Sequence, residues 1–296
     1  MQVSLTAFLE RAGLLLDRLE PMLPPRVCAI DWQSCLAARW QRQGAHGWLK
    51  PLRVDSGLQL DDLLGIERQR DLLLANTRQF VAGMPANHAL LWGARGTGKS
   101  SLVRALLMRF AGQGLRLIEI ERDRLVDLPQ VVESLGALPQ RFVLFCDDLS
   151  FDAGEADFRV LKSVLDGSLE CAPDNVLLYA TSNRRHLLAE KQSDNENWQR
   201  VDEELHPSEA VEDRIALSDR FGLWLSFYPF SQDHYLAVVR HWLGQIAEAA
   251  NCSWQWSEEL EKAALRWALG RGNRNGRCAQ QFARHWVGMQ LLQAGG

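Results

Sequence analysis

The chain has 296 residues, of which 47% are hydrophobic and 24% charged, a composition typical of folded globular proteins. Its formal net charge of −4 argues against sequence-independent binding to a polyanion such as DNA. No apolar run is long enough to cross a bilayer, and the first residues lack the pattern of a secretory leader. We therefore expect a cytoplasmic protein outside the membrane, with its six cysteines reduced.

The N-terminal part of the sequence favours helices. Residues 5–20 place apolar side chains at helical spacing until several prolines end the pattern, and residues 31–41 predict a second, short helix. A stretch punctuated by glycine and proline follows, so we place the end of a helical N-terminal extension, 1–57, at that point. Residues 60–82 predict another helix, with Asp61 and Asp62 at its N-terminal side.

From about residue 88 onward, short apolar runs alternate with helical segments. This alternation predicts a mainly parallel sheet covered by helices, an α/β core over residues 58–230. Beyond the core the periodicity is helical only, which predicts a C-terminal helical lid subdomain, 231–296. The expected strands are 88–92, 115–120, 141–146, 175–180 and 223–228, and the expected lid helices are 231–250, 257–272 and 275–293.

The strongest motif is a glycine-rich loop between an expected strand and an expected helix. The run GARGTGKS at 93–100 fits the pattern G-x-x-x-x-G-K-S/T, whose glycines let backbone N–H groups and the helix N-terminus face phosphate oxygens. Lys99 would reach the β- and γ-phosphates, and Ser100 would bind magnesium. The expected phosphate-binding residues are Gly93, Ala94, Arg95, Gly96, Thr97, Gly98, Lys99, Ser100 and Ser101.

Acidic and amide side chains follow two later strands. The apolar run FVLFC ends in Asp147, which would hold the magnesium shell, and Asp148, which would orient or polarise the attacking water. Asn183, after the next strand, would position water near the γ-phosphate, although an asparagine there is by itself more often a turn former. Arg220 precedes the last strand and Arg277 opens the last helix; on spacing alone both could be surface charges.

In this order the motifs resemble those of the AAA+ ATPases, over about residues 60–293. The resemblance implies sensor 1 at Asn183, a finger-type arginine at Arg220 that acts on a neighbouring subunit, and sensor 2 at Arg277. More narrowly, the runs LLWGARGTGKSSLVRALL, FVLFCDDLSF and LSDRFGLWLSFYPF resemble a bacterial AAA+ family described as a domain of unknown function.

The same resemblance implies ATP and magnesium as ligands. It places Leu63, Leu64, Gly65 and Ile66 in the adenine pocket, although core packing of a helix explains these side chains equally well. The catalytic residues would be Asp148, Asn183 and Arg220.

Two functions remain open at this point, because Asp148 stands where most AAA+ members have glutamate. The first is an ATPase, working as a ring or transient homo-oligomer, that remodels or loads a macromolecular partner. The second is a slow ATP/ADP switch whose states order the charged segment 191–214, a candidate mobile loop. Arg184, Arg185 and His186 would suit a phosphate backbone, but a solvated charge cluster is the simpler interpretation, and a small-molecule kinase lacks an evident acceptor pocket.

Overall fold

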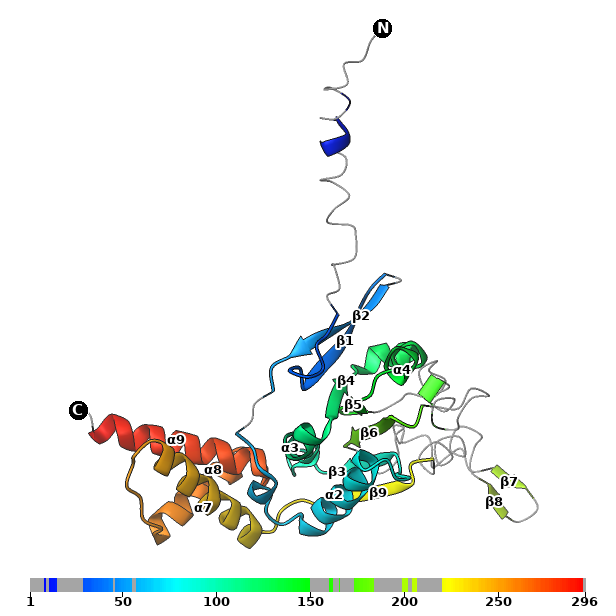
Figure 1. Ribbon diagram of the computed structural model, residues 1–296. Helices are drawn as coiled ribbons and strands as arrows, with labels where there is room; N and C mark the ends of the chain where they lie inside the picture. Colours follow the sequence, from blue (N-terminus) through cyan, green and yellow to red (C-terminus); the bar gives the residue numbers. More distant parts are fainter. Residues whose placement is uncertain are drawn as a thin grey trace.

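The part of the chain described by the computed structural model forms a seven-stranded sheet and, beside it, a bundle of helices (Figure 1). The strand order in the sheet is β2-β1-β4-β5-β6-β3-β9. No helix among the described residues is both long and apolar enough to span a membrane. The described residues are 8, 11–14, 29–44, 46–54, 57–149, 160–161, 165, 173–183, 199–201, 204–206 and 220–294.

The five strands that the sequence predicts all form, and they pair with one another in parallel, as expected. The residues of β3, β4, β5 and β6 are mostly buried on both faces, the usual pattern for a parallel strand between helical layers, whereas β9 buries Leu225 and Phe227 and leaves its other residues half-buried. Their pairings are all parallel, and β3 lies between β6 and β9. These strands are β3 (Ala89–Gly93), β4 (Leu115–Glu119), β5 (Arg141–Cys146), β6 (Val176–Ser182) and β9 (Leu223–Phe227).

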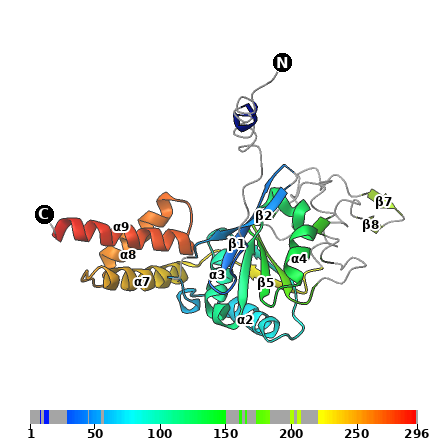
Figure 2. The same ribbon diagram turned by 45° about the horizontal axis from the view of Figure 1, so that its top comes forward.

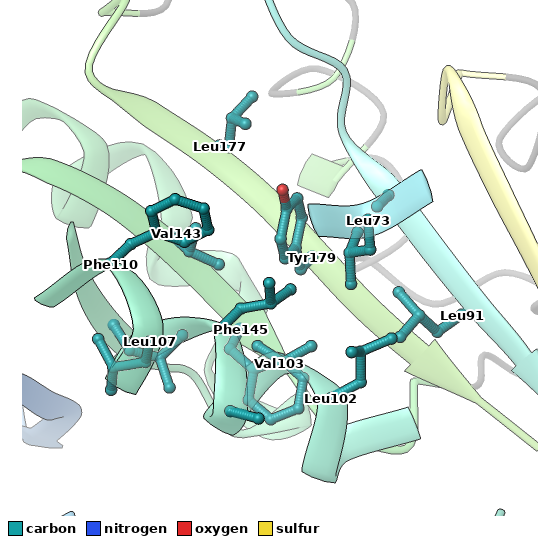
Figure 3. Close-up of a cluster of buried hydrophobic side chains, with 14 of the residues drawn as sticks. Leu73, Leu91, Leu102, Val103, Leu107, Phe110, Val143, Phe145, Leu177 and Tyr179 are labelled. Carbon is teal, nitrogen blue, oxygen red and sulfur yellow. The ribbon is translucent and has the colours of Figure 1, made fainter. Parts of the chain in front are cut away.

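The two faces of the sheet pack against different helices (Figure 2). On β5, Phe142 and Leu144 join the cluster beneath α4 (Leu128–Gly136), whereas Val143 and Phe145 join the cluster beneath α2 (Glu67–Val81) and α3 (Lys99–Phe110). The alternation follows from the two-residue period of a strand. Figure 3 shows the second cluster, in which side chains of α2 and α3 contact β5 and β6. Short 3₁₀ turns, η3 (Ala111–Gln113) and η4 (Arg122–Asp127), precede β4 and α4.

The C-terminal helices form a bundle with its own hydrophobic core. They are α7 (Gln232–Ala249), α8 (Glu258–Gly270) and α9 (Gly276–Ala294), as the periodicity of the sequence predicts. Ser231 and Ser257 cap α7 and α8, each by accepting a hydrogen bond from a backbone N–H of the first turn. In both views the bundle lies beside the sheet, at the side of α3 (Figure 2). We call this bundle the lid.

The helix predicted at residues 31–41 is wrong. Instead, β1 (Ala37–Gln43) and β2 (His46–Leu52) form an antiparallel pair, and β1 pairs in parallel with β4. The side chain of Trp40, on β1, is buried in the cluster beneath α4, and its indole N–H donates to Asp127 at 2.9 Å. The alanines, arginines and glutamines of this segment favour helix locally, but pairing with the free edge of β4 outweighs that weak preference.

The helix predicted at 60–82 is interrupted. A 3₁₀ turn, η2 (Leu60–Asp62), is separated from α2 by a short loop in which Gly65 has a φ of +73°. A glycine adopts this left-handed conformation without steric penalty, and here it ends one element before the next begins. Of the helix predicted at 5–20, only residues 8 and 11–14 are described, and they are helical. Within 191–214 the structure describes β7 (Gln199–Val201) and β8 (Glu204–His206), whereas residues 184–186 lie outside the described residues.

Candidate nucleotide-binding site

The glycine-rich loop runs from the end of β3 to the start of α3. Gly93, Gly96 and Gly98 have φ values of +128°, +76° and +102°, which residues with a side chain rarely adopt. At Gly93 a Cβ atom would also lie 2.0 Å from the carbonyl oxygen of Phe227, which accepts a hydrogen bond from the N–H of Ala94 at 3.0 Å. The glycines therefore shape a loop that other residues cannot form.

Lys99 lies in the first turn of α3 with its ammonium group inside the loop. Its Nζ donates to the carbonyl oxygens of Gly93 and Ala94, both at 2.7 Å, and contacts Oδ1 of Asn183 at 3.3 Å. The residue is only 6% exposed, and this burial lowers the pKa of Lys99 to about 8, against the opposing attraction of Asp147 and Asp148. A bound anion would restore the preference for the charged form.

Ser100 and Asp147 meet at the carboxyl end of β5. Ser100 Oγ and Thr181 Oγ1 each donate to Oδ1 of Asp147 at 2.6 Å. A hydroxyl and a carboxylate are hard oxygen donors of the kind that magnesium prefers, so this pair fits the metal that the motif implies. Thr181 is the residue that sequence reasoning missed here; as the sixth residue of β6 it is placed by strand pairing rather than by any local pattern.

Asp148 lies in a left-handed conformation, with a φ of +55°. Aspartate tolerates this region better than most residues do. Its N–H donates to Thr181 Oγ1 at 2.9 Å, its carboxylate accepts from Nδ2 of Asn183, and its Oδ2 lies 3.6 Å from the guanidinium of Arg95. Asn183 thus touches both Lys99 and Asp148, which joins the expected P-loop, acid and sensor residues in one group.

A cavity of about 750 Å³ lies over this group, between the core and the lid. Its volume lies in the range of pockets that bind a whole small ligand. The core wall contributes Arg95, Gly96, Thr97, Gly98, Lys99, Ser100, Ser101, Arg104, Asp147, Asp148, Thr181 and Asn183, the loop before α2 contributes Gly57, Leu58, Asp62, Leu63, Leu64 and Ile66, and the lid side contributes Phe230, Val238, Trp242, Ile246, Gly276, Arg277, Gln280 and Arg284.

The loop between η2 and α2 forms the apolar end of the cavity. Leu63, Leu64 and Ile66 line it, whereas Gly65 shapes the loop without lining the cavity. Leu64 O lies 2.8 Å from Nε2 of His234 in α7, and a Cβ atom on Gly65 would lie only 2.0 Å from that ring. Gly65 therefore permits the lid to approach the core at this end.

Two arginines and a glutamine of α3 and α9 that sequence reasoning missed also face the cavity. Arg104 lies four residues after Ser100 on α3, and Gln280 and Arg284 lie three and seven residues after Arg277 on α9. These spacings place each set on one face of its helix, a signal that was readable once Ser100 and Arg277 had been identified. The same spacing groups Val238, Trp242 and Ile246 on α7.

Arg220 is the one expected site residue that lies far from the glycine-rich loop. It precedes β9, which runs parallel to β3 with Leu223 beside Ala89 and Phe227 beside Gly93. Arg220 therefore lies beyond the starting end of these strands, whereas the glycine-rich loop follows their other end. The five residues of β9 alone separate the two ends by about 16 Å at 3.3 Å per residue.

Comparison with known proteins identifies a family and a fold. The family model described as "Protein of unknown function (DUF815)" matches residues 33–290. The structure of the Aeropyrum pernix Orc1 protein in complex with DNA matches with a TM-score of 0.54 and 14% identity, over 79% of this chain and 65% of that chain. A RuvB mutant from Thermotoga maritima matches with a TM-score of 0.50 and 16% identity, over 77% of this chain and 64% of that chain.

This chain thus matches slightly less than two thirds of each of those two solved chains. The Thermotoga maritima RuvB Holliday junction branch migration motor is similar at a TM-score of 0.44 and 14% identity, over 77% of this chain and 72% of that chain. No curated protein matches. Together with the strand order and the P-loop, the two higher-scoring structures identify the fold as that of the AAA+ ATPases, as the motifs predict.

Proposed function

Because the chain belongs to the DUF815 family and has the AAA+ fold, we propose that it binds ATP with magnesium and hydrolyses it to remodel or load a macromolecular partner. The observation that carries the proposal is the meeting of Lys99, Asp148 and Asn183 at one end of the sheet. A buried cation, a carboxylate and an amide in contact are the groups that positioning and charge stabilisation in phosphoryl transfer require.

Each group has a distinct proposed role. The loop N–H groups and the Lys99 ammonium would bind the β- and γ-phosphates, and Ser100 with Asp147 would hold magnesium, which when bound neutralises phosphate charge. Asp148 would orient the attacking water, and Asn183, which already donates to Asp148, would hold it in place beside the γ-phosphate. The apolar end of the cavity, with Leu63, Leu64 and Ile66, would take the adenine.

Arg220 would serve the site of a neighbouring subunit. Arg220 lies before the start of β9, whereas its own P-loop follows the end of β3, and this separation supports a role at another subunit's site. This supports a homo-oligomer, ring-shaped or transient, in which each subunit lends an arginine to the next. The sequence predicts an extension at 1–57, a core at 58–230 and a lid at 231–296; because β1 pairs with β4 in the core sheet, we propose that the core also includes β1 and β2.

A slow nucleotide switch is the second candidate, and the state of Asp148 favours it. Its shorter side chain is held by Asn183 and lies near Arg95, in a left-handed backbone conformation. The carboxylate of Asp148 would have to give up its contact with Asn183 or Arg95 before it could orient water, which would slow turnover. The Orc1 structure contains DNA, but a net charge of −4 gives a DNA partner no support from charge.

Phosphate release by wild-type protein and by Asp148→Asn tests the proposal. The variant should bind ATP with wild-type affinity and lose about 10²- to 10⁴-fold in kcat, because the phosphate cradle remains and only the water-orienting carboxylate is lost. Asp174→Asn, at an exposed position ahead of β6, is the matched control and should hydrolyse ATP normally. ATP binding without measurable turnover by wild type would favour the switch, and no binding would refute both functions.

The same variant identifies the partner. An ATP-bound, hydrolysis-blocked protein should retain the partner that the active cycle releases, so Asp148→Asn with ATP should capture more of it than with ADP. Nucleic acid and protein should both be analysed in the captured material.

A further inference from the structure

The tip of the lid helix α9 contacts the glycine-rich loop directly. Asn275 is the residue before α9, and its Nδ2 donates to the carbonyl oxygen of Arg95 at 3.1 Å. The next N–H, that of Gly276, donates to the carbonyl oxygen of Gly96 at 2.9 Å. Two successive carbonyl groups of the phosphate loop are therefore held by two successive residues of the lid.

The other end of the same amide group caps the helix. Oδ1 of Asn275 accepts a hydrogen bond from the N–H of Cys278 at 2.8 Å, the geometry of an N-cap residue. The amide oxygen of Asn275 therefore accepts a hydrogen bond within the lid, and the amide nitrogen of the same side chain donates one to the core. An ordinary cap needs only the acceptor, so the donor is the feature that capping does not explain.

The loop is shaped to receive this amide. A Cβ atom on Gly96 would lie 2.7 Å from both Cγ and Nδ2 of Asn275, closer than real contacts allow. The φ of +76° at Gly96 and the approach of Asn275 both require glycine at this position. Two residues beyond Asn275, the exposed Arg277 lines the cavity.

We propose that Asn275 is a positioning residue that ties the lid to the phosphate loop through its amide donor, and that ATP affinity depends on this tie. The inference rests on the proposed nucleotide function. By holding the tip of α9 on the loop, Asn275 presents Arg277 to the cavity before nucleotide arrives, so that less freedom is lost on binding. Breaking the tie removes preorganisation, which acts on substrate binding rather than on the chemical step.

Asn275→Asp separates the tie from the cap. Aspartate caps a helix as well as asparagine does, but its carboxylate cannot donate to Arg95 O. We expect KM for ATP to rise roughly tenfold, with kcat at saturating ATP within about twofold and an unchanged thermal midpoint. Asn275→Ser, which also caps but adds no charge, should raise KM by a smaller factor, roughly two- to fivefold.

Asn273→Asp is the matched control, because Nδ2 of Asn273 donates only within the lid, to Arg271 O at 3.2 Å. It should leave KM unchanged. Amide hydrogen exchange supplies a readout independent of nucleotide: in Asn275→Asp the N–H of Gly276 should exchange faster, whereas that of Cys278 should stay protected by the new cap.

Several results would overturn the inference. The first two are a wild-type KM for ATP in Asn275→Asp and an equal rise in KM in Asn273→Asp. The third is a rise in KM in Asn275→Asp without one in Asn275→Ser, which would mean that the added charge alone causes the effect. The fourth is an unchanged exchange rate for the N–H of Gly276. If wild-type protein binds no ATP, the proposed function fails, and the exchange at Gly276 by itself then decides whether the tie exists.

Discussion

The two walls of the cavity differ in how firmly their polar side chains are held. On the core wall, Lys99, Asp147, Asp148 and Asn183 are joined to one another or to neighbouring backbone by hydrogen bonds. On the lid wall, the side chains of Arg277 and Arg284 are exposed and make no hydrogen bond or ion pair with another described residue. Arg104 on α3 is the exception on the core wall, because its exposed side chain is equally without such a bond to any described residue.

Because of this difference, the side chains of the core wall are in place to bind phosphate before it arrives, whereas the arginines of the lid wall become ordered only when it binds. Groups fixed before binding lose little entropy when the ligand arrives, so they contribute strongly to binding and catalysis. Long, exposed arginines lose rotamer freedom when they become ordered, which offsets part of each contact. We therefore expect large effects from changes on the core wall and from the neighbouring subunit's arginine, and smaller effects from the lid.

The largest effect should come from Arg220→Ala, which belongs to neither wall of its own cavity. An arginine that stabilises the transferring phosphoryl group in trans is worth about 10³–10⁵ in rate, so the variant should bind ATP and scarcely hydrolyse it. Titration with ATP and phosphate release measure the two separately.

Mixing tests whether Arg220 acts across subunits. A Lys99→Ala subunit keeps its arginine and an Arg220→Ala subunit keeps its pocket, so the two inactive proteins together should recover part of the rate. Recovery should increase with protein concentration as subunits associate. If co-assembled mixtures stay inactive, Arg220 does not act in trans, and the two walls of the cavity form a site that needs no residue from a neighbouring subunit.

Lys99→Ala tests the core wall. It removes the cation that the loop encloses, and the affinity for ATP should fall by roughly 10²-fold, since hydrogen bonds to charged groups are worth about 1.5–3 kcal/mol each. Calorimetry measures the affinity, and circular dichroism should show an unchanged fold. Arg109→Ala, at an exposed position on the same helix and outside the cavity, is the control and should bind ATP as wild type does.

The pKa of Lys99 predicts how affinity changes with pH. Burial lowers this pKa to about 8, so the free protein loses the ammonium proton as pH rises through 8. Bound phosphate favours the charged form, so binding above pH 8 takes up a proton and affinity should fall about tenfold per pH unit. Below about pH 7 Lys99 is already protonated and contributes no dependence. Lys99→Arg, whose charge does not titrate, should remove the dependence; a flat wild-type profile from pH 7 to 9.5 would contradict the prediction.

Among the changes to residues that line the cavity, Arg277→Ala should have the smallest effect, because the side chain is exposed and must be ordered by the ligand. We expect a five- to tenfold loss of ATP affinity, which is less than one hydrogen bond to a charged group usually contributes, because ordering the arginine offsets part of the contact. ATP should also cease to protect the chain from proteolysis near residues 229–231, where the core leads into the lid. Arg274→Ala, three residues earlier and outside the cavity, should keep that protection. Full protection in Arg277→Ala would mean that the lid closes by other contacts.

The sequence by itself determined the elements whose signals are local. The loop at 93–100 could be recognised because glycines at positive φ and a lysine at the helix start have few alternatives. The parallel strands and the lid helices followed from apolar runs and from helical periodicity, which burial enforces in any fold that uses them. The meeting of Lys99 with Asn183 could be expected because parallel strands end at the same edge.

Features that depend on a partner far away in the chain could not be read from the sequence and required the folded structure. Ala37, Ala38 and Trp40 suit a helix or a strand, and the free edge of β4, about 80 residues away, selects the strand. The hydrogen bond from Asn275 to Arg95 joins residues whose separation in sequence carries no pattern, as does the contact of His234 with Leu64. Such contacts depend on how the lid packs on the core, and packing is settled by the shapes of whole surfaces rather than by the spacing of residues along the chain.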